Sequence, residues 1–365
     1  MIVDAHTDVL LELVIGRGGG RSVELVLRRG PERLFERYWL PRLEAGGVGV
    51  QVCPLYGANA PRGEARDRAL GQEAEFGRAV AANPQRVCHV RTRADLDDPR
   101  LRLVLSMEGV EPLEGDPGAF EEWYHRGMRS ASLTWNHANA FAGGIYTPTQ
   151  GLTDRGRRLV HRFAELGVVL DLAHASEQTW RDALAEQVPF SVTHAGCRAV
   201  CDDPRNLADW QLEALAERGG VLGMMALAFA VDPQAPTLAR WLDHVDHAVA
   251  VMGIEHVGLG ADFVDQVPRT EQDNGVDEMP HAQTMAVDKA RLGLAEFTGP
   301  EDYPVLVTAL RERGYHGERL DTITSGNWLR ILRAALPSYP APAPARDPEC
   351  AVAAGTPRAP ESDPG

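Results

Sequence analysis

The chain has 365 residues, with 37 Lys and Arg against 52 Asp and Glu, which gives a formal net charge of −15 at pH 7. This acidic balance argues against a nucleic-acid partner, because a phosphate backbone selects clustered basic side chains. The hydrophobic content of 44% is typical of a globular protein. No stretch approaches the ~20 uninterrupted apolar residues that a membrane span needs, so we expect no membrane partner.

The sequence begins MIVDAHTDVL, with acidic residues and a histidine where a secretory signal would carry a basic patch and an apolar run. The five cysteines, Cys53, Cys88, Cys197, Cys201 and Cys350, are odd in number and have no repeating spacing. Such usage fits a reducing compartment better than a disulfide scaffold. Together these features predict a cytoplasmic protein.

Eight short apolar runs, each bounded by Gly, Pro or polar turns, are predicted to form strands. They lie at about 2–5, 48–53, 103–107, 129–134, 168–172, 189–193, 220–225 and 256–260. Amphipathic segments of helical period separate most of them, as at 64–82, 154–167 and 238–253. This α/β alternation implies a parallel sheet covered on its outer face, and eight such units would close a (β/α)8 TIM barrel.

A doubly wound open sheet is the competing architecture. The first strand is not followed directly by a phosphate-binding glycine fingerprint, which weakens the dinucleotide-binding version of that fold. The glycine-rich segment GRGGGR at 16–21 does not lie between a strand and a clear helix start, and we interpret it as a flexible loop. Because α/β barrels take ~250 residues or more as one unit, we expect a single catalytic domain over 1–336.

Two further segments are predicted from composition. The polar, acidic stretch at about 266–283 is too long for an ordinary connection and is expected to form a lid over the site. The segment 337–365 contains eight prolines and little aliphatic content, so it cannot bury enough surface to become ordered. We predict that 337–365 is a disordered, Pro-rich C-terminal tail.

Side chains of the metal-ligand type follow five of the eight predicted strands. They are His6 and Asp8 after the first strand, Glu108 after the third, His174 after the fifth, His194 after the sixth and Asp262 after the eighth. In a (β/α)8 barrel these strand ends meet at the face that carries the active site. His6 and Asp8 are two residues apart, so in extended chain they point to the same side and can bind one ion together.

This donor set is too large for a closed tetrahedral zinc site, but it suits two metal ions that share one carboxylate. Two such ions lie ~3.5 to 4 Å apart and need an anionic bridge. The one lysine of the chain, Lys289, lies outside every predicted strand, which argues against a carboxylated lysine in that role. Glu108 is the acidic group directly after the third strand, and it is the predicted bridge.

Each residue also has a structural interpretation. His6 and Asp8 could form a turn with a local Asp cap, and Glu108 could cap a helix. His194 with Cys197 and Cys201 resembles part of a small zinc cluster, but no second pair at finger spacing completes it.

Among the remaining histidines, His244 and His247 lie on a helical segment of the sequence. We assign both of them to its solvated face.

Several stretches in register resemble the membrane dipeptidase family, also called renal dipeptidases, a branch of the amidohydrolase-type barrels. They are DAHTD at 4–8, MEG at 107–109, LTWNHAN at 133–139, DLAHAS at 171–176, THAGCRAVCDDPRN at 193–206, HVGLGADF at 256–263 and SGNWLRIL at 325–332. The resemblance therefore covers nearly all of the chain before the tail.

The resemblance implies roles for individual residues of this chain. His6 and Asp8 would bind one zinc, His174 and His194 the other, and Glu108 would bridge the two.

It further implies that Arg205, with Asn206 beside it, binds the C-terminal carboxylate of the substrate. Asp262 would be the proton-transfer carboxylate. An arginine fork matches a carboxylate with two parallel hydrogen bonds, although DDPRN is also an ordinary turn in which Arg205 would be a surface charge.

One position departs from the family pattern. Typical members carry a histidine directly after LT, where this chain has Trp135. His137 lies two residues further on, and if the chain remains extended it faces the same way and could take the catalytic place of that histidine. Trp135 would then fill volume and narrow the substrate pocket, while the alternative is that His137 only packs in the loop.

These features predict a zinc-dependent dipeptidase that uses two Zn²⁺ per chain to hydrolyse L,L dipeptides, with L,D dipeptides as further candidates. A homodimer is a further expectation. One alternative is the same metal chemistry on a specialised non-peptide or non-proteinogenic amide of secondary metabolism, an option that Trp135 raises. The other is a catalytically silent barrel that binds a small ligand or a partner protein.

Overall fold

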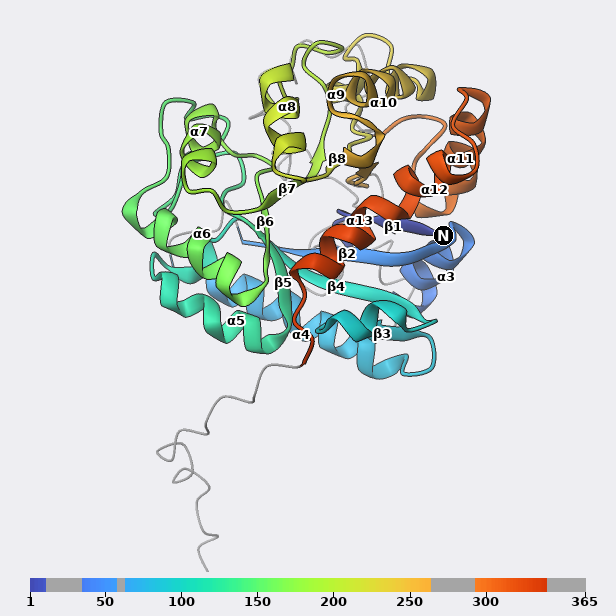
Figure 1. Cartoon of the computed structure of the whole chain (residues 1–365). Helices are drawn as coiled ribbons and strands as arrows, with labels where there is room; N and C mark the ends of the chain where they lie inside the picture. Colours follow the sequence, from blue (N-terminus) through green and yellow to red (C-terminus); the bar gives the residue numbers. More distant parts are fainter. Residues whose placement is uncertain (11–34, 58–62, 264–292, 340–365) are drawn as a thin grey trace, which may run out of the picture.

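Figure 1 shows the computed structural model of the chain, which describes residues 1–10, 35–57, 63–263 and 293–339. The glycine-rich segment at 16–21, the predicted lid at 266–283 and Lys289 lie outside the described residues. So does all but the first part of the predicted tail, from residue 340 onward.

All strands that the structure describes are parallel and belong to one sheet. They are β1 (Ile2–Asp4), β2 (Val48–Tyr56), β3 (Val87–His89), β4 (Leu101–Glu108), β5 (Met128–Ser132), β6 (Val169–Asp171), β7 (Phe190–Ala195), β8 (Leu222–Met224) and β9 (Val257–Leu259). β1 pairs with β2 on one side and with β9 on the other, and β2 pairs directly with β4. Eight strands therefore close a barrel, which confirms the predicted fold and excludes the open sheet.

The ninth strand, β3, was not predicted from the sequence. It pairs only with Leu101–Leu103 at the start of β4, whereas β5 pairs with β4 from Leu105 onward. β3 therefore occupies the part of the β4 edge that β5 leaves open and does not enter the barrel. Three residues, the last of them half-buried, are too short a run to give a strand signal.

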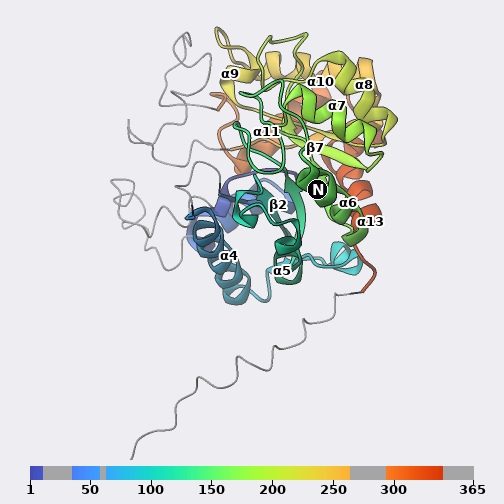
Figure 2. The same cartoon turned by 90° about the vertical axis from the view of Figure 1, so that its left-hand side faces the viewer.

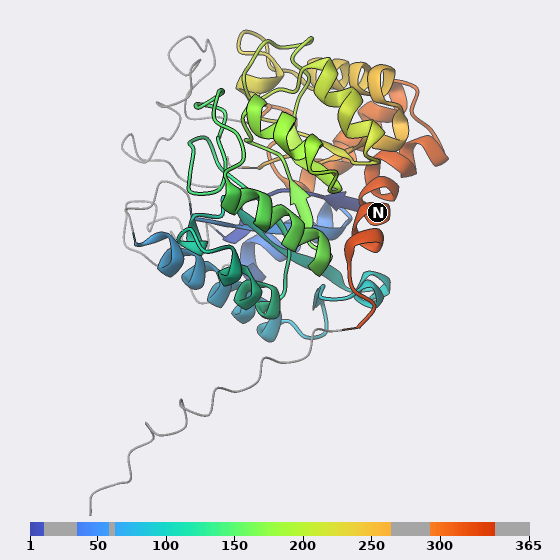
Figure 3. The ribbon, with the colours of Figure 1, turned by 60° about the vertical axis from the view of Figure 1, so that its left-hand side comes forward.

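Helices form the outer layer of the barrel, as Figures 2 and 3 show from two further sides. The α-helices are α3 (Leu40–Ala45), α4 (Ala65–Ala82), α5 (Phe120–Arg126), α6 (Asp154–Leu166), α7 (Glu177–Ala185), α8 (Asp209–Glu217), α9 (Ala228–Val231), α10 (Leu238–Met252), α11 (Tyr303–Glu312), α12 (Glu318–Asp321) and α13 (Asn327–Ala335). The three amphipathic segments quoted from the sequence are α4, α6 and α10. No helix in these described ranges is long and apolar enough to cross a membrane.

The helix boundaries follow from local chemistry. The hydroxyl of Thr153 accepts a hydrogen bond from the backbone N–H of Gly156 and caps the start of α6. Gly167 ends α6 at a φ of 71°, a left-handed conformation that costs glycine little. Ser176 caps α7 and Thr237 caps α10 in the same way as Thr153.

The last helix, α13, closes one end of the barrel. Its buried Trp328 and Leu332 pack in one cluster with Val3, Val50 and Val104 from the strands, and Figure 1 shows α13 crossing in front of them. The side-chain amide of Asn327 donates to the carbonyl oxygens of Ile254 and Val257, at 2.7 Å each. The SGNWLRIL stretch therefore serves to dock this helix.

Gly127 ends α5 in a conformation and a space that only glycine fits. Its φ is 106°, and a Cβ atom there would lie 2.3 Å from Cε1 of His89 on β3. We expect Gly127→Ala to lower the free energy of unfolding by about 2 to 4 kcal/mol, because backbone strain and a steric clash add. Gly219→Ala is the matched control, since Gly219 has a φ of 70° but no atom within 4 Å of its would-be Cβ.

Urea denaturation of both variants checks this expectation. Gly219→Ala should cost only the strain, about 1 to 2 kcal/mol. Equal losses of stability in the two variants would show that the His89 ring can move away from the new Cβ atom without a cost in free energy.

His89 gives the fold a defined pH dependence. Burial and the charge of Arg91 lower the pKa of His89 from 6.5 to about 3. Its contribution to stability is complete above pH 6.5 and is lost as the pH falls from 6.5 towards 3, because the unfolded chain then binds a proton that the folded chain does not. The ring accepts from Nε of Arg91 and contacts the carbonyl oxygen of Gly127, two roles that a glutamine amide can also fill.

We therefore expect His89→Gln to make the protein less sensitive to acid. Between pH 7.5 and pH 5 the wild-type protein should lose up to about 2 kcal/mol more stability than the variant. Urea denaturation of both proteins at the two pH values measures this difference. Equal losses of stability in the two proteins would mean that folded His89 is already protonated at pH 5.

Candidate metal centre

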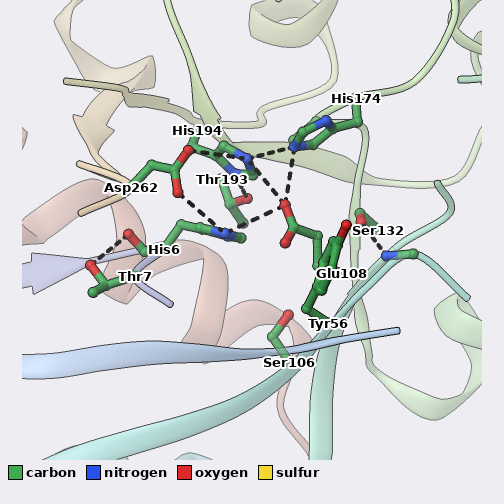
Figure 4. A network of polar contacts seen from close by, with 12 residues as sticks. His6, Thr7, Tyr56, Ser106, Glu108, Ser132, His174, Thr193, His194 and Asp262 are labelled. Carbon is green, nitrogen blue, oxygen red and sulfur yellow. Dashed lines mark hydrogen bonds and ion pairs between the residues drawn. The ribbon is translucent and has the colours of Figure 1, made fainter. Parts of the chain in front are cut away.

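The residues expected to bind metal come together at the C-terminal ends of the barrel strands. His6 and Asp8 follow β1, Glu108 is the last residue of β4, His174 follows β6, His194 lies within β7 and Asp262 follows β9. Asp8 is half-buried and the other five are buried. Figure 4 shows Glu108 pointing between the imidazole rings of His6, His174 and His194, with Asp262 beside them.

The ligand atoms form three overlapping groups, each within 4.8 Å. One group is His6, Asp8 and Glu108, the second is Glu108, His174 and His194, and the third is His6, His194 and Asp262. Glu108 is common to the first two groups. The first two groups contain the residues that the sequence led us to expect around two ions, and Glu108 is the carboxylate that they share. The number of ions stays a prediction.

Glu108 lies at the centre of the cluster. Its Oε1 atom is 3.0 Å from Nε2 of His174, 3.5 Å from Nε2 of His194 and 3.6 Å from Nε2 of His6. Asp262 approaches from the other side, with its carboxylate oxygens 3.8 Å from Nε2 of His6 and 4.0 Å from Nε2 of His194. Each carboxylate therefore faces more than one imidazole.

The electrostatics of this cluster favour a cation. Burial, together with the charges of Asp8 and Asp262, raises the pKa of Glu108 well above its usual range. Burial and the charge of Arg205 lower the pKa of His6 to about 3, so its imidazole is neutral at pH 7. A neutral imidazole is the form of histidine that binds a metal ion, and a bound cation would offset the cost of ionising Glu108.

Hydrogen bonds fix the tautomers of two of the imidazoles. The Oδ1 atom of Asn136 lies 2.8 Å from Nδ1 of His174, and because this oxygen can only accept, that nitrogen carries the proton. The hydroxyl of Thr193 donates to the carboxylate of Asp171, so it accepts from Nδ1 of His194, 2.9 Å away. Both histidines therefore present a lone pair at Nε2.

Those two Nε2 atoms lie only 2.9 Å apart. Nη2 of Arg205, 3.1 Å from Nε2 of His174, offers a donor to one of the two lone pairs. Nε2 of His6 is buried and has no hydrogen-bond partner among the described residues. The donor set thus fits metal ions: imidazoles oriented by outer partners and carboxylates that share them.

Two buried aspartates that sequence reasoning missed hold the strand ends. Asp4 accepts from the backbone N–H of His6 at 3.2 Å, from that of Ala261 at 3.3 Å and from the hydroxyl of Thr7 at 2.7 Å. It thereby ties the end of β1 to the end of β9. Burial raises the pKa of Asp4 to about 6, against the lowering effect of these donors.

Asp171 has the same role between β6 and β7. Its carboxylate accepts from the N–H of Ala173 at 2.9 Å and from that of Thr193 at 3.0 Å. Both aspartates are the last residue of a buried strand, after an otherwise apolar run. That placement is the signal that could have identified them.

Two residues of the cluster have strained backbones. His174 has a φ of 61° and Asp262 a φ of 58°, a left-handed conformation that is uncommon for residues other than glycine. This conformation turns their side chains inward just beyond the end of a strand. Such strain is found preferentially at functional sites.

Arg205 points into the cluster and is not a surface charge. It is buried, and its Nη2 atom lies 3.1 Å from Nε2 of His174 and 3.3 Å from the carbonyl oxygen of His194. Burial lowers its pKa, against the opposing charges of Asp262 and Glu108.

The neighbouring Asn206 holds the loop with its amide nitrogen. Its amide nitrogen donates to the carbonyl oxygens of Cys201 and Ala230, at 2.9 and 2.7 Å. Its Oδ1 atom is buried and has no hydrogen-bond partner among the described residues, and the predicted substrate-binding role of Asn206 stays a prediction.

Trp135 and His137 do not share a face, because the extended chain that this expectation required ends early. β5 stops at Ser132, and residues 135–137 form a bend. Trp135 packs beside the cluster, with its ring 5.9 Å from that of His174 and 5.4 Å, edge on, from that of Tyr56. His137 is exposed and its ring lies 5.2 Å from that of Tyr146, outside the three ligand groups.

His244 corrects a second expectation, because it does not lie on the solvated face of its helix. It is buried, its Nδ1 accepts from the N–H of Cys197 at 2.9 Å, and its Nε2 lies 3.0 Å from the carbonyl oxygen of Val231. This histidine fastens α10 to the loop after β7. His247, by contrast, pairs with Asp209 at 2.7 Å, toward the surface.

A cavity of about 420 Å³ adjoins the cluster. Its wall includes His174 and Arg205, and it extends between the loops that follow β6 and β7 towards the starts of α7 and α8. A volume of this size is within the range of small-molecule sites.

The sequence and the fold both match known proteins. The family model described as membrane dipeptidase (peptidase family M19) matches residues 1–281. An uncharacterised protein from the pqqA 5′ region of Klebsiella pneumoniae is 30% identical over 253 residues, which cover 65% of this chain and 83% of that protein. Dipeptidase 3 of Mus musculus is 28% identical over 309 residues, 80% of this chain. The chain spans only 57% of the length of that mouse relative.

A solved structure shares the fold over nearly the whole chain. It is a metallopeptidase from Rhodobacter sphaeroides liganded with a phosphinate mimic of the dipeptide L-Ala-D-Ala. Its TM-score is 0.75 at 23% identity, and the match covers 92% of this chain and 99% of that one. With its family model matched over most of its length and a cluster of metal-binding side chains at the barrel mouth, this chain belongs to the membrane dipeptidase family, peptidase family M19, and is a metal-dependent hydrolase.

Proposed function

We propose that this protein is a dipeptidase that hydrolyses the amide bond of dipeptides with a free C-terminal carboxylate, using two zinc ions. The observation that carries this proposal is the pair of ligand groups that share Glu108, with the buried Arg205 beside them. The ligand groups would bind the ions that act on the reacting atoms, and Arg205 would hold an anionic end of the substrate.

His6 and Asp8 would hold one zinc and His174 and His194 the other, with Glu108 contributing to both. When bound, the two ions supply a water of lowered pKa and polarise the scissile carbonyl group. The chain's own residues then orient the substrate and move protons.

Asp262 is the proton carrier in this proposal. Its carboxylate faces His6 and His194 and lies on the strand end opposite Glu108. From there it can accept a proton from the attacking water and deliver it to the leaving amine. The strained backbone at Asp262 fixes this orientation.

Arg205 orients the substrate. A guanidinium group binds a carboxylate with two parallel hydrogen bonds, which are stronger inside a buried site than in water. Because Arg205 lies next to His174, this contact places the amide bond that precedes the carboxylate over the ligand cluster. The enzyme would therefore cleave dipeptides in preference to internal peptide bonds.

Trp135 and Tyr56 would form the aromatic wall of the same site, beside His174. Trp135 stands where a typical family member carries a histidine, so it is the residue that decides which amides fit. The phosphinate mimic bound by the Rhodobacter relative makes L-Ala-D-Ala a suitable first L,D substrate to test. A cytoplasmic location and a homodimer stay predictions.

The proposed activity is tested with zinc-reconstituted protein and a panel of L,L and L,D dipeptides. We expect release of free amino acids, loss of activity on chelation, and a loss of ~100-fold or more in kcat for Asp262→Asn, because a proton carrier is removed. Asp321→Asn, an exposed position on α12, is the control and should keep full activity.

Other outcomes have defined meanings. Two bound zinc ions without cleavage of any dipeptide would contradict the proposal and point to a specialised amide, with Trp135 as the selective residue. Full turnover by Asp262→Asn would refute the proton-transfer role while leaving the dipeptidase assignment in place.

The hydrogen bonds that orient His174 and His194 are expected to raise the affinity for metal ions. We expect Asn136→Ala and Thr193→Val each to weaken zinc binding about 10- to 100-fold, since each removes the acceptor that orients an imidazole. Thr308→Val, an exposed change of the same shape on α11, is the control. Competition with a chromophoric chelator reads the affinity without turnover, and unchanged affinity in both variants would mean that these residues serve the fold alone.

A further inference from the structure

The cavity beside His174 and Arg205 contains a second arginine that neither the metal cluster nor the fold uses. Arg198 lies four residues after His194 and lines the cavity wall. Its Nε atom is buried and has no hydrogen-bond partner among the residues that the structure describes. Within the described part of the chain, no carboxylate lies within ion-pair distance of its guanidinium group.

The backbone around Arg198 is fixed. Its N–H donates to the carbonyl oxygen of Leu207 at 2.8 Å, and Cys197 pairs with Leu207 in an isolated bridge. The N–H of Cys197 also donates to His244. Because the loop is held on both sides, the side chain starts from a defined place in the cavity wall.

The acidic residues of the cavity do not neutralise Arg198. Glu177 is paired with Arg181 at 2.6 Å, one turn along α7, and Asp202 is exposed. The start of α7, with its partial positive charge, also lies at this cavity. The interior therefore carries the charge of Arg198 as well as that of Arg205.

Part of the remaining wall is apolar, with Ile145, Leu172 and Trp180 among its residues. Such a wall suits the methylene groups of a short side chain, while the polar end of that chain meets a charged group. A buried donor without a partner costs free energy, and a ligand that supplies the acceptor recovers it.

We propose that this cavity receives the side chain of the substrate's C-terminal residue and that Arg198 binds a carboxylate on that side chain. The preferred substrates are then dipeptides that end in an aspartyl or glutamyl residue. This inference rests on the proposed function: Arg205 holds the main-chain carboxylate, and Arg198 holds the second. Water adds across the amide C–N bond, its hydroxyl to the carbonyl carbon and its proton to the amine, and a free acidic amino acid is released.

The decisive experiment compares dipeptides that share an N-terminal residue and end in Asp, Glu, Asn, Ala or Lys. We expect kcat/KM to be highest for the acidic pair. Arg198→Gln should lower it about 10- to 100-fold for Asp and Glu, mainly through KM, and by less than about threefold for Ala, because one charge-assisted hydrogen bond is lost. Arg158→Gln on α6, which removes an exposed arginine outside the cavity, should leave the whole profile unchanged.

A binding measurement separates this inference from the proposed function. Calorimetry with the zinc-loaded protein should show succinate, with two carboxylates, binding about tenfold or more tightly than butyrate, and Arg198→Gln should abolish the difference. This reading needs no turnover. If no dipeptide is cleaved but succinate is still preferred through Arg198, the proposed function fails and the anion site stands.

Two results would overturn the inference itself. One is hydrolysis with equal kcat/KM for Ala and acidic substrates, or an acidic preference that survives Arg198→Gln. The other is a preference for Lys at the second position, which would mean that Asp202 and Glu177, and not Arg198, bind the substrate side chain.

Discussion

The crowding of carboxylates in a poorly solvated place at one end of the barrel is the constraint on which the site depends. Asp8 and Asp262 raise the cost of ionising Glu108, and Arg205 is a cation whose charge acts on the cluster from within. Like charges in a poorly solvated place are tolerated only where positive charge is supplied. The imidazoles, the strained backbones and the outer hydrogen bonds all serve to keep that place ready for metal ions.

Much of the architecture could be predicted because burial leaves a strong trace in the sequence. Strands buried on both faces are continuous apolar runs, and ligands such as Glu108 and His194 stand where those runs end. β3 escaped prediction because three residues give no periodic signal. The bend after Ser132 and the burial of His244 depend on tertiary contacts, which local sequence patterns do not predict.

The outer residues of the site were the hardest to find. Asp4 and Asp171 end apolar strands like the ligands themselves, but they face backbone N–H groups and not the cluster. A sequence shows that a carboxylate follows a strand and does not show what it will meet. The roles of Thr193 and Asn136 likewise appear only once the neighbouring strand ends lie side by side.

The pairing of β1 with β9 has a consequence for how this protein is made. Asp4 pairs with Leu259, and its carboxylate accepts from the N–H of Ala261. The barrel can therefore close only after the last strand has formed and paired with the first. Contacts so distant along the chain form late in folding, and chains are synthesised from the N-terminus. His6 and Asp262 therefore meet only when synthesis has passed β9. A chain that ends before β9 therefore lacks the third ligand group, which His6, His194 and Asp262 form.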